Sequence, residues 1–202
     1  MLALTFDDGP SPNTAAVLDV LEAYGGRGTF FVLGESIERD PQHAELLRRA
    51  AAAGHEVGNH TYSHPHLGEL DETALRTELD RTTALIEQHT GGPPQTVRCP
   101  YGDDEERVSR VVAGTTMAAV IHWSVDPEDW SDPAPEEITE RVLSEAAPGA
   151  IVVMHDGEGR ANTAQALATL VPELLRRGFE LVTVSELLSQ PFPTGGGRTR
   201  LG

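Results

Sequence analysis

The feature that most constrains the fold is the alternation of short apolar runs with longer amphipathic segments. Seven short runs, most of them bounded by Gly, Pro or Asp, have the composition of β-strands: residues 2–6, 29–33, 55–58, 96–98, 119–125, 150–154 and 179–184. Segments with helical spacing of apolar residues occur between them, at 14–24, 71–88 and 162–177. Strands that alternate with helices favour a parallel sheet with crossover helices. The pattern alone does not separate an open sheet from a closed barrel.

Length and charge restrict the organisation and the partners of the chain. A chain of 202 residues is long enough for one domain with a single large core. We expect this domain to span residues 1–190, followed by a flexible Pro/Gly-rich tail at 191–202. Fifteen basic against 32 acidic residues give a net charge of -17, which excludes nucleic acid and anionic membrane surfaces as partners. No apolar run approaches the roughly 18 residues needed for membrane insertion, and the lone Cys99 excludes an internal disulfide.

Ionisable side chains follow the predicted strands where each strand ends. Asp7 and Asp8 come after the first run, and His155 comes after the sixth. The other candidates follow the runs between them: His60, His64, Arg98, Pro100, Tyr101, Asp126, Asp129 and Trp130. The carboxyl ends of parallel strands lie on one face of a sheet, where binding sites form. These distant segments therefore predict a single site on one rim of the sheet.

Two pairs of residues, Asp7–Asp8 and His60–His64, are consistent with a metal site. Adjacent carboxylates at a strand end point in roughly opposite directions, so one can bind a metal while the other acts as a base. The alternative is a turn, because D-D-G-P is also good turn sequence. Two His four residues apart can face one ion in a helix or tight turn, and with one carboxylate they leave positions open for water, as catalytic sites do. Two surface His in a loop are the alternative there.

The other candidates carry weaker individual signals. Arg98 offers a planar fork that can orient a carboxylate, and the turn after it can aim a backbone N–H at an oxyanion, although a structural turn explains this segment better. Trp130 can stack on a sugar ring or belong to the core. His155 follows a buried strand, where it can act as a general acid or form a buried pair with a carboxylate.

Five of these segments form an ordered set along the chain. They are T-F-D-D-G-P at 5–10, H-T-Y-S-H at 60–64, R-C-P-Y-G at 98–102, D-P-E-D-W at 126–130 and I-V-V-M-H-D at 151–156. Together and in this order they resemble the motifs of the polysaccharide deacetylase family, the NodB-homology domains of carbohydrate esterase family 4. The resemblance covers residues 2 to about 188. It implies an α/β fold, a distorted (β/α) barrel with about seven parallel strands in a single domain.

The resemblance also implies roles for the residues that match the motifs. A divalent metal, most commonly zinc with cobalt as an alternative, is expected on three ligands: Asp8, His60 and His64. Asp7 is expected to be the general base and Arg98 to orient it. His155 is expected to be the general acid, with Asp129 preferred to Asp126 as its carboxylate partner.

Substrate contacts are expected from Pro100, Tyr101 and Trp130, and the backbone N–H of Tyr101 is expected in the oxyanion hole.

The function implied is removal of N-acetyl groups from polysaccharides or oligosaccharides that contain N-acetylglucosamine, such as chitin or peptidoglycan. An acetylxylan esterase is one alternative, and an inactive carbohydrate-binding module is a more remote one. The acidity favours neutral acetylated glycans over strongly anionic polymers. We expect a monomer that is secreted or associated with the cell wall, although the opening residues M-L-A-L-T-F show no signal peptide.

Overall fold

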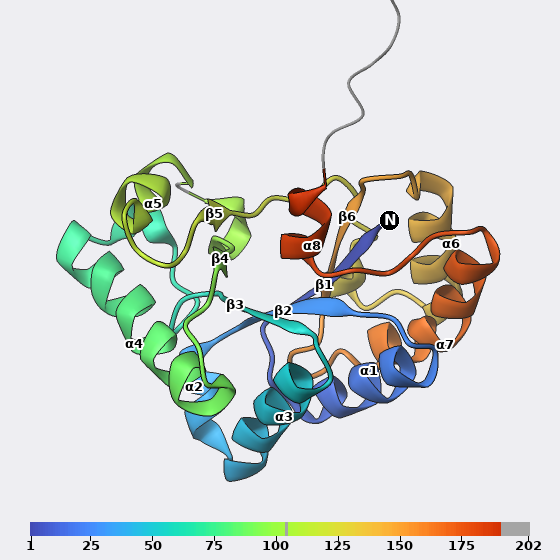
Figure 1. Cartoon of the computed structure of the whole chain (residues 1–202), viewed down its shortest axis with the longest axis horizontal. Helices are drawn as coiled ribbons and strands as arrows, with labels where there is room; N and C mark the ends of the chain where they lie inside the picture. The colour runs from blue at the N-terminus through green and yellow to red at the C-terminus, as the bar shows by residue number, and fades with distance from the viewer. Residues whose placement is uncertain (104, 191–202) are drawn as a thin grey trace, which may run out of the picture.

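Six parallel strands form one curled sheet in this computed structural model, which describes residues 1–103 and 105–190. In spatial order they are β5 (Ala119–Val120), β4 (Thr96–Val97), β3 (Glu56–Asn59), β2 (Gly28–Val32), β1 (Ala3–Asp7) and β6 (Ile151–His155) (Figure 1). The predicted parallel α/β fold is therefore confirmed. The tail expected at 191–202 lies outside the described residues.

The strand β1, second from one edge of the sheet, places the first motif between β2 and β6. All its residues are buried, because β2 and β6 flank it and helices cover it, as is usual for parallel strands. Its last residue, Asp7, is in register with Phe31 of β2 and with His155 of β6. Two candidate residues from opposite ends of the chain are therefore neighbours at one end of the sheet.

The segment 119–125 links the two edges of the sheet and makes it barrel-like. Its first residues form β5 beside β4, whereas Val125 makes an isolated bridge to Val152 of β6. The Val125 N–H donates to the Ile151 carbonyl at 3.2 Å, and the Val153 N–H donates to the Val125 carbonyl at 3.0 Å. The sheet thus curls into a half-barrel.

The seventh predicted strand, at 179–184, forms only one bridge, between Leu181 and Leu2. It ends there because Thr183 and Glu186 make a reciprocal capping box that starts the helix α8 (Val184–Ser189). The barrel accordingly has six strands where about seven were expected.

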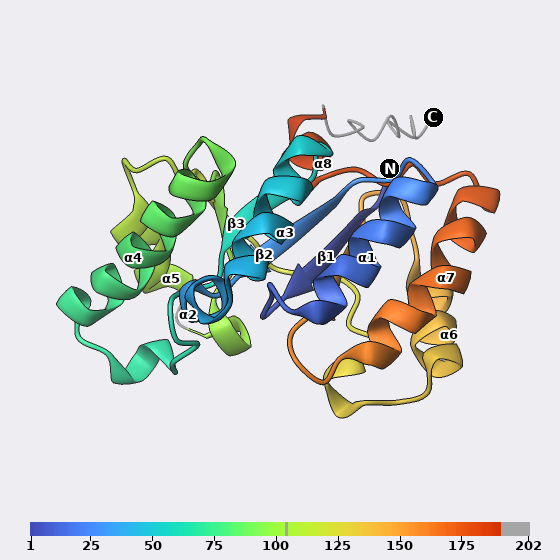
Figure 2. The ribbon, with the colours of Figure 1, turned by 90° about the horizontal axis from the view of Figure 1, so that it is seen from below.

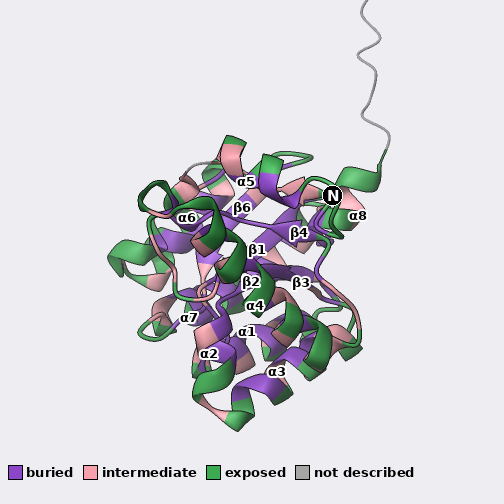
Figure 3. Ribbon diagram, turned by 90° about the vertical axis from the view of Figure 1, so that its left-hand side faces the viewer, coloured by how far each residue is buried: buried purple, intermediate pink, exposed green. Residues whose placement is uncertain are grey.

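Helices cover the outer side of the sheet (Figures 1 and 2). The long ones are α1 (Pro12–Ala23), α3 (Pro41–Ala52), α4 (Glu72–Thr90), α6 (Pro135–Glu145) and α7 (Ala161–Arg176). The short ones are α2 (Gly34–Arg39) and α5 (Glu105–Val112), and the 3-10 turns are η1 (Leu67–Glu69), η2 (Pro100–Gly102) and η3 (Asp129–Ser131). Figure 3 shows buried strands behind helices whose outer faces are exposed. None of the helices described is long and apolar enough to cross a membrane.

Candidate active site

A cleft of about 510 Å³ opens at the carboxyl ends of the strands. Its lining residues include Asp7, Asp8, His60, His64, Tyr101, Trp123, Asp126, Trp130, His155 and Arg160. Arg98 and Asp129 are buried behind these residues, and Pro100 is buried at the start of η2 and is not among the lining residues. The structure thus brings all five motifs to one rim.

Arg98 holds Asp7 in place inside the molecule. The Arg98 guanidinium is fully buried and donates to Asp7 Oδ1 at 2.8 Å and to Thr5 Oγ1 at 2.6 Å. Its charge also lies over the ring of Phe31, at 4.3 Å from the centroid. Burial raises the pKa of Asp7, but the charges of Arg98, His60 and His155 outweigh this effect and hold the pKa below its usual value. Asp7 is therefore a carboxylate fixed in one orientation.

Asp8 faces two imidazoles. Its Oδ1 lies 3.6 Å from His60 Nε2 and 3.4 Å from His64 Nε2. Asp8 has a φ of 73°, in the left-handed region, so its side chain leaves the strand in a different direction from that of Asp7. The two adjacent carboxylates consequently have different partners.

The loop that carries both His residues is a tight turn held by side-chain acceptors. Thr61 and His64 have positive φ values of 73° and 57°. Asn59 Oδ1 accepts from the Thr61 N–H at 2.8 Å, and Glu78 accepts from the N–H groups of residues 62 and 63, both at 2.8 Å. These contacts bring the two rings within 5.0 Å, centroid to centroid, without a helix.

The donors around Asp8 fit a divalent cation. Asp8 Oδ1 is buried without a hydrogen-bond partner among the residues described. His60 Nδ1 lies 2.8 Å from the Arg98 carbonyl, which can only accept, so the proton sits on Nδ1 and Nε2 keeps its lone pair for a ligand. Burial and then the neighbouring His60 lower the pKa of His64, which favours the neutral imidazole that a metal requires. One carboxylate oxygen and two imidazole nitrogens within 4.8 Å of one another suit zinc with open positions.

His155 forms a pair with Asp129 beside Asp7. His155 Nδ1 donates to Asp129 Oδ1 at 2.7 Å, and Asp129 Oδ2 accepts from the His155 backbone N–H at 2.8 Å and from the Thr163 hydroxyl at 2.6 Å. Burial alone lowers the pKa of His155, but the hydrogen bond and charge of Asp129 raise it to about 9. Asp126, the other aspartate of this motif, instead accepts from the Glu128 N–H at 2.8 Å.

Exposed aromatic rings flank the cleft. Tyr101 and Trp130 are 60% and 52% exposed, which is high for large apolar side chains and typical of a surface that binds sugar rings. The Tyr101 ring stacks on His66, with centroids 4.1 Å apart. Tyr101 has a φ of 59°, which is uncommon for a residue with a side chain. Several other residues around the cleft also have positive φ values.

Several residues at the site were not predicted. Thr5 and Thr163 bond Arg98 and Asp129 respectively, and nothing in the sequence signals these contacts. Asp156 directly follows the predicted site residue His155, so its position in the sequence could have indicated that it lies near the site. It is buried, and its Oδ2 accepts from the Thr14 hydroxyl at 2.5 Å. Burial raises its pKa to about 7.

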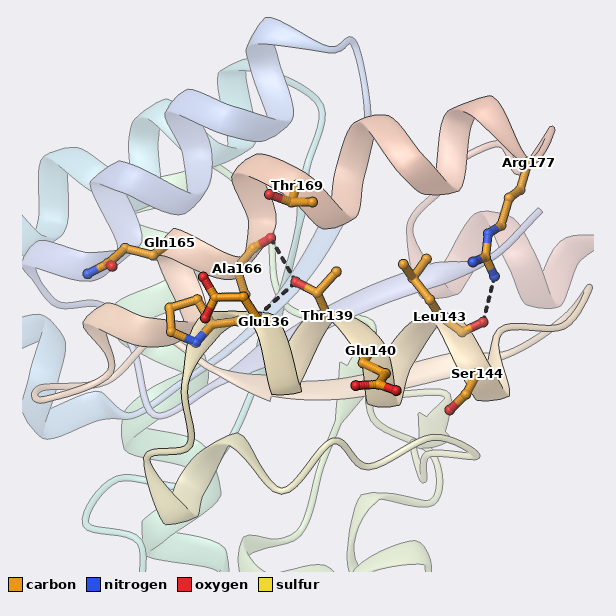
Figure 4. A pocket seen from close by; sticks show the side chains of 10 residues that line it. Glu136, Thr139, Glu140, Leu143, Ser144, Gln165, Ala166, Thr169 and Arg177 are labelled. Atoms are coloured by element: carbon orange, nitrogen blue, oxygen red, sulfur yellow. Dashed lines mark hydrogen bonds between the residues drawn. The ribbon is translucent and has the colours of Figure 1, made fainter.

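A larger cavity of about 620 Å³ lies between α6 and α7, away from these groups (Figure 4). Some of its polar side chains bond neighbouring backbone: Thr139 donates to the Pro135 and Ala166 carbonyls, and Arg177 donates to the Leu143 carbonyl. Neither a His nor a convergent group of polar atoms lines it. The smaller cleft therefore has the stronger case for chemistry.

Comparison with known proteins agrees with the motifs. Residues 1–120 match the family model described as polysaccharide deacetylase. The chain belongs to the polysaccharide deacetylase family. Among its relatives, a chitooligosaccharide deacetylase of Bradyrhizobium sp. (strain ANU 289) is 41% identical over 198 residues, covering 91% of this chain and 89% of that protein.

Other members of the polysaccharide deacetylase family carry peptidoglycan in their names. A peptidoglycan-N-acetylglucosamine deacetylase of Listeria monocytogenes is 38% identical over 195 residues, which cover 96% of this chain but 40% of that longer protein. The solved peptidoglycan deacetylase PdaC of Bacillus subtilis superposes with a TM-score of 0.83 at 39% identity, covering 93% of this chain and 89% of that one. The half-barrel is therefore the fold of this family.

Proposed function

We propose that the chain is a metal-dependent hydrolase that removes N-acetyl groups from N-acetylglucosamine units of a chitin-like or peptidoglycan glycan. The observation that carries this proposal is that two adjacent carboxylates have different partners. Asp7 is bound to Arg98, whereas Asp8 faces His60 and His64. Amide hydrolysis needs both an activated water and a base beside it, and this pairing supplies a place for each.

Asp8, His60 and His64 would hold the cation. A divalent ion on these ligands would supply Lewis acidity, which acidifies a water and polarises the acetyl carbonyl. The chain's own contribution is to preorient these donors. The His60 Nδ1–H bond to the Arg98 carbonyl and the Glu78 contacts to the loop perform this task.

Asp7 accepts the proton of the attacking water. Its pKa, held low by Arg98, keeps it ionised at neutral pH, and its Oδ2 lies 3.8 Å from His60 Nε2, beside the cation ligands. As the tetrahedral centre forms, the backbone N–H of Tyr101 stabilises the charge on the former carbonyl oxygen.

His155 donates a proton to the departing sugar nitrogen, which is a poor leaving group without one. With a pKa of about 9, the imidazole is charged at neutral pH, and Asp129 occupies Nδ1 so that Nε2 is the atom free to donate. The C–N bond breaks as the nitrogen gains this proton, and the products are acetate and a free amine. Trp130 and Tyr101 offer their exposed rings to the sugar.

Acetate release decides between this function and the alternatives. We expect purified protein to release acetate from chitooligosaccharides or peptidoglycan. This release should stop after chelation of the metal and return when zinc or cobalt is added. Full activity after verified metal removal would contradict the metal site. Release from acetylxylan alone would favour the esterase, and no release from any of the three substrates would favour a binding module. The named relatives act on chitooligosaccharide and peptidoglycan, and for this reason we propose a secreted or wall-associated protein. We also propose that it works as a monomer.

A further inference from the structure

Arg160 differs from the other basic residues of the chain. All fifteen basic residues are arginines, and in the ranges 1–103 and 105–190 each of the others donates to a carboxylate or carbonyl oxygen. Within the same ranges, the side chain of Arg160 has neither an ion pair nor a hydrogen bond. A guanidinium has five donor hydrogens. In a chain with 32 acidic residues, this uncommitted cation needs an explanation.

Its position places Arg160 beside the proposed chemistry. It is the N-cap residue of α7, in the loop that leaves β6 after His155. It lines the catalytic cleft and also a neighbouring cavity of about 220 Å³. Asp8 and His64 line both cavities as well, so Arg160 lies where the two meet.

The other guanidinium groups at this junction are already engaged. In the smaller cavity, Arg39 is held between Glu35 at 3.2 Å and Glu158 at 3.1 Å. In the cleft, Arg98 is buried against Asp7. An anion that enters beside the cation ligands therefore has one uncommitted guanidinium to bind, that of Arg160.

The local backbone adds to this preference for an anion. N-cap positions favour Ser, Thr, Asp and Asn, whose oxygens cap the helix, whereas Arg160 makes no side-chain cap bond. Its side chain is therefore not used to start α7. The N-terminal end of a helix carries partial positive charge, which favours a bound anion further.

We propose that Arg160 binds a carboxylate beside the acetamido group that is cleaved. The proposal rests on the deacetylase function above and deepens it. The carboxylate has two possible sources: the lactyl ether of an adjoining N-acetylmuramic acid, or the acetate that the reaction releases. If the carboxylate is the lactyl group, the site prefers carboxylated glycans. The overall negative charge of the chain, in contrast, favours neutral glycans.

The test compares a disaccharide of N-acetylglucosamine and N-acetylmuramic acid with its lactyl methyl ester, on the metal-loaded protein. The two substrates differ in one charge. We expect Arg160→Gln to lower the acid-to-ester ratio of kcat/KM about tenfold and Arg160→Lys to retain part of it, as for a charge-assisted hydrogen bond. Arg176→Gln, at the other end of α7 and paired with Glu173, is the matched control and should leave the ratio unchanged.

Acetate inhibition separates the two sources. If Arg160 holds released acetate, Arg160→Gln raises the inhibition constant of acetate about tenfold while the acid-to-ester ratio stays as in the unmodified chain. The proposal is overturned if both quantities stay within about twofold of their original values. Thermal unfolding checks that Arg160→Gln folds, which we expect because this side chain makes no hydrogen bond within the described residues.

Acetate release from neutral chitooligosaccharides tests the proposed function separately. If the unmodified chain releases none from any substrate, the function is wrong. Calorimetric binding of the acid and the ester to the unmodified chain and to Arg160→Gln still decides the role of Arg160 in that case, because binding needs no turnover. Equal binding of the acid by both proteins would refute it.

Discussion

Replacing Asp129 by asparagine removes one negative charge from behind His155 and nearly preserves the shape of the side chain. The carboxylate of Asp129 accepts three hydrogen bonds, two from His155 and one from the Thr163 hydroxyl. An amide oxygen can keep part of this set, but it cannot supply the charge. The substitution therefore isolates the electrostatic contribution of Asp129 to the proposed general acid.

The structure gives the size of this contribution. The rise in the pKa of His155 from 6.5 to about 9 corresponds to ~3 kcal/mol in favour of the charged imidazolium. Burial opposes that rise, and Asp129 is its largest source. In Asp129→Asn we therefore expect the pKa to fall to about 7 or below, with Asp7 and Asp8 supplying what remains of the increase.

The same shift links pH to stability. A histidine whose pKa is raised by folding contributes its full stabilisation below the unfolded pKa of about 6.5, and this contribution is lost as the pH rises through the folded value of about 9. The free energy of unfolding of the unmodified chain should therefore fall by up to ~3 kcal/mol over this window. Asp129→Asn should lack most of that fall.

Three measurements check this reasoning. NMR titration of the His155 ring in metal-free protein gives the pKa directly, and urea unfolding at several pH values gives the stability. The alkaline limb of the kcat/KM profile of the metal-loaded protein should move to lower pH in Asp129→Asn. Asp126→Asn is the matched control, because Asp126 bonds the Glu128 N–H instead. The reasoning is refuted if His155 still titrates near 9 in Asp129→Asn, or if the control shifts it equally.

Four further substitutions test the rest of the site and its support. Asp7→Asn should keep the bound metal but lower turnover at least ~100-fold. Asp8→Asn should lose the metal, which elemental analysis measures. The reverse pattern would make Asp8 the base and Asp7 the metal ligand. His155→Ala should slow amide substrates more than activated acetate esters, since a good leaving group needs less protonation, and equal losses would count against a general acid. Gly58→Ala should destabilise the fold by ~1–3 kcal/mol in urea unfolding, because its Cβ would lie 2.6 Å from the Phe31 ring. Gly92→Ala, with no atom within 4 Å, is the control, and equal effects would refute the packing argument.

The sheet was predictable because most of its strands are buried and read as apolar runs. The run at 179–184 looked like the others, yet it forms only the Leu2–Leu181 bridge. The signal that ends it, Thr183 with Glu186 three residues later, is a local capping pattern present in the sequence. The double role of 119–125, by contrast, depends on how far the sheet curls, which no local pattern encodes.

The rim of candidate residues was predictable for the same reason, because each follows a strand. Which of them touch was not. Asp126 and Asp129 are equivalent as acids in sequence, and only the turn of η3 brings Asp129 under His155. Thr163, in the first turn of α7, lies 34 residues beyond Asp129, and its hydroxyl meets the carboxylate only through the tertiary fold.

Overall charge and local charge act over different distances, and the two need not agree about a ligand. A net charge of -17 governs how an anion approaches, and salt screens that effect beyond about 10 Å at ordinary ionic strength. Contact inside the cleft depends on which charges remain uncommitted after folding. Arg98 forms an ion pair with Asp7, whereas the side chain of Arg160 has no such partner within the described ranges. A carboxylated sugar that is repelled at long range can thus still be the better ligand once it reaches the cleft, because salt does not screen its contact with the nearby Arg160 guanidinium.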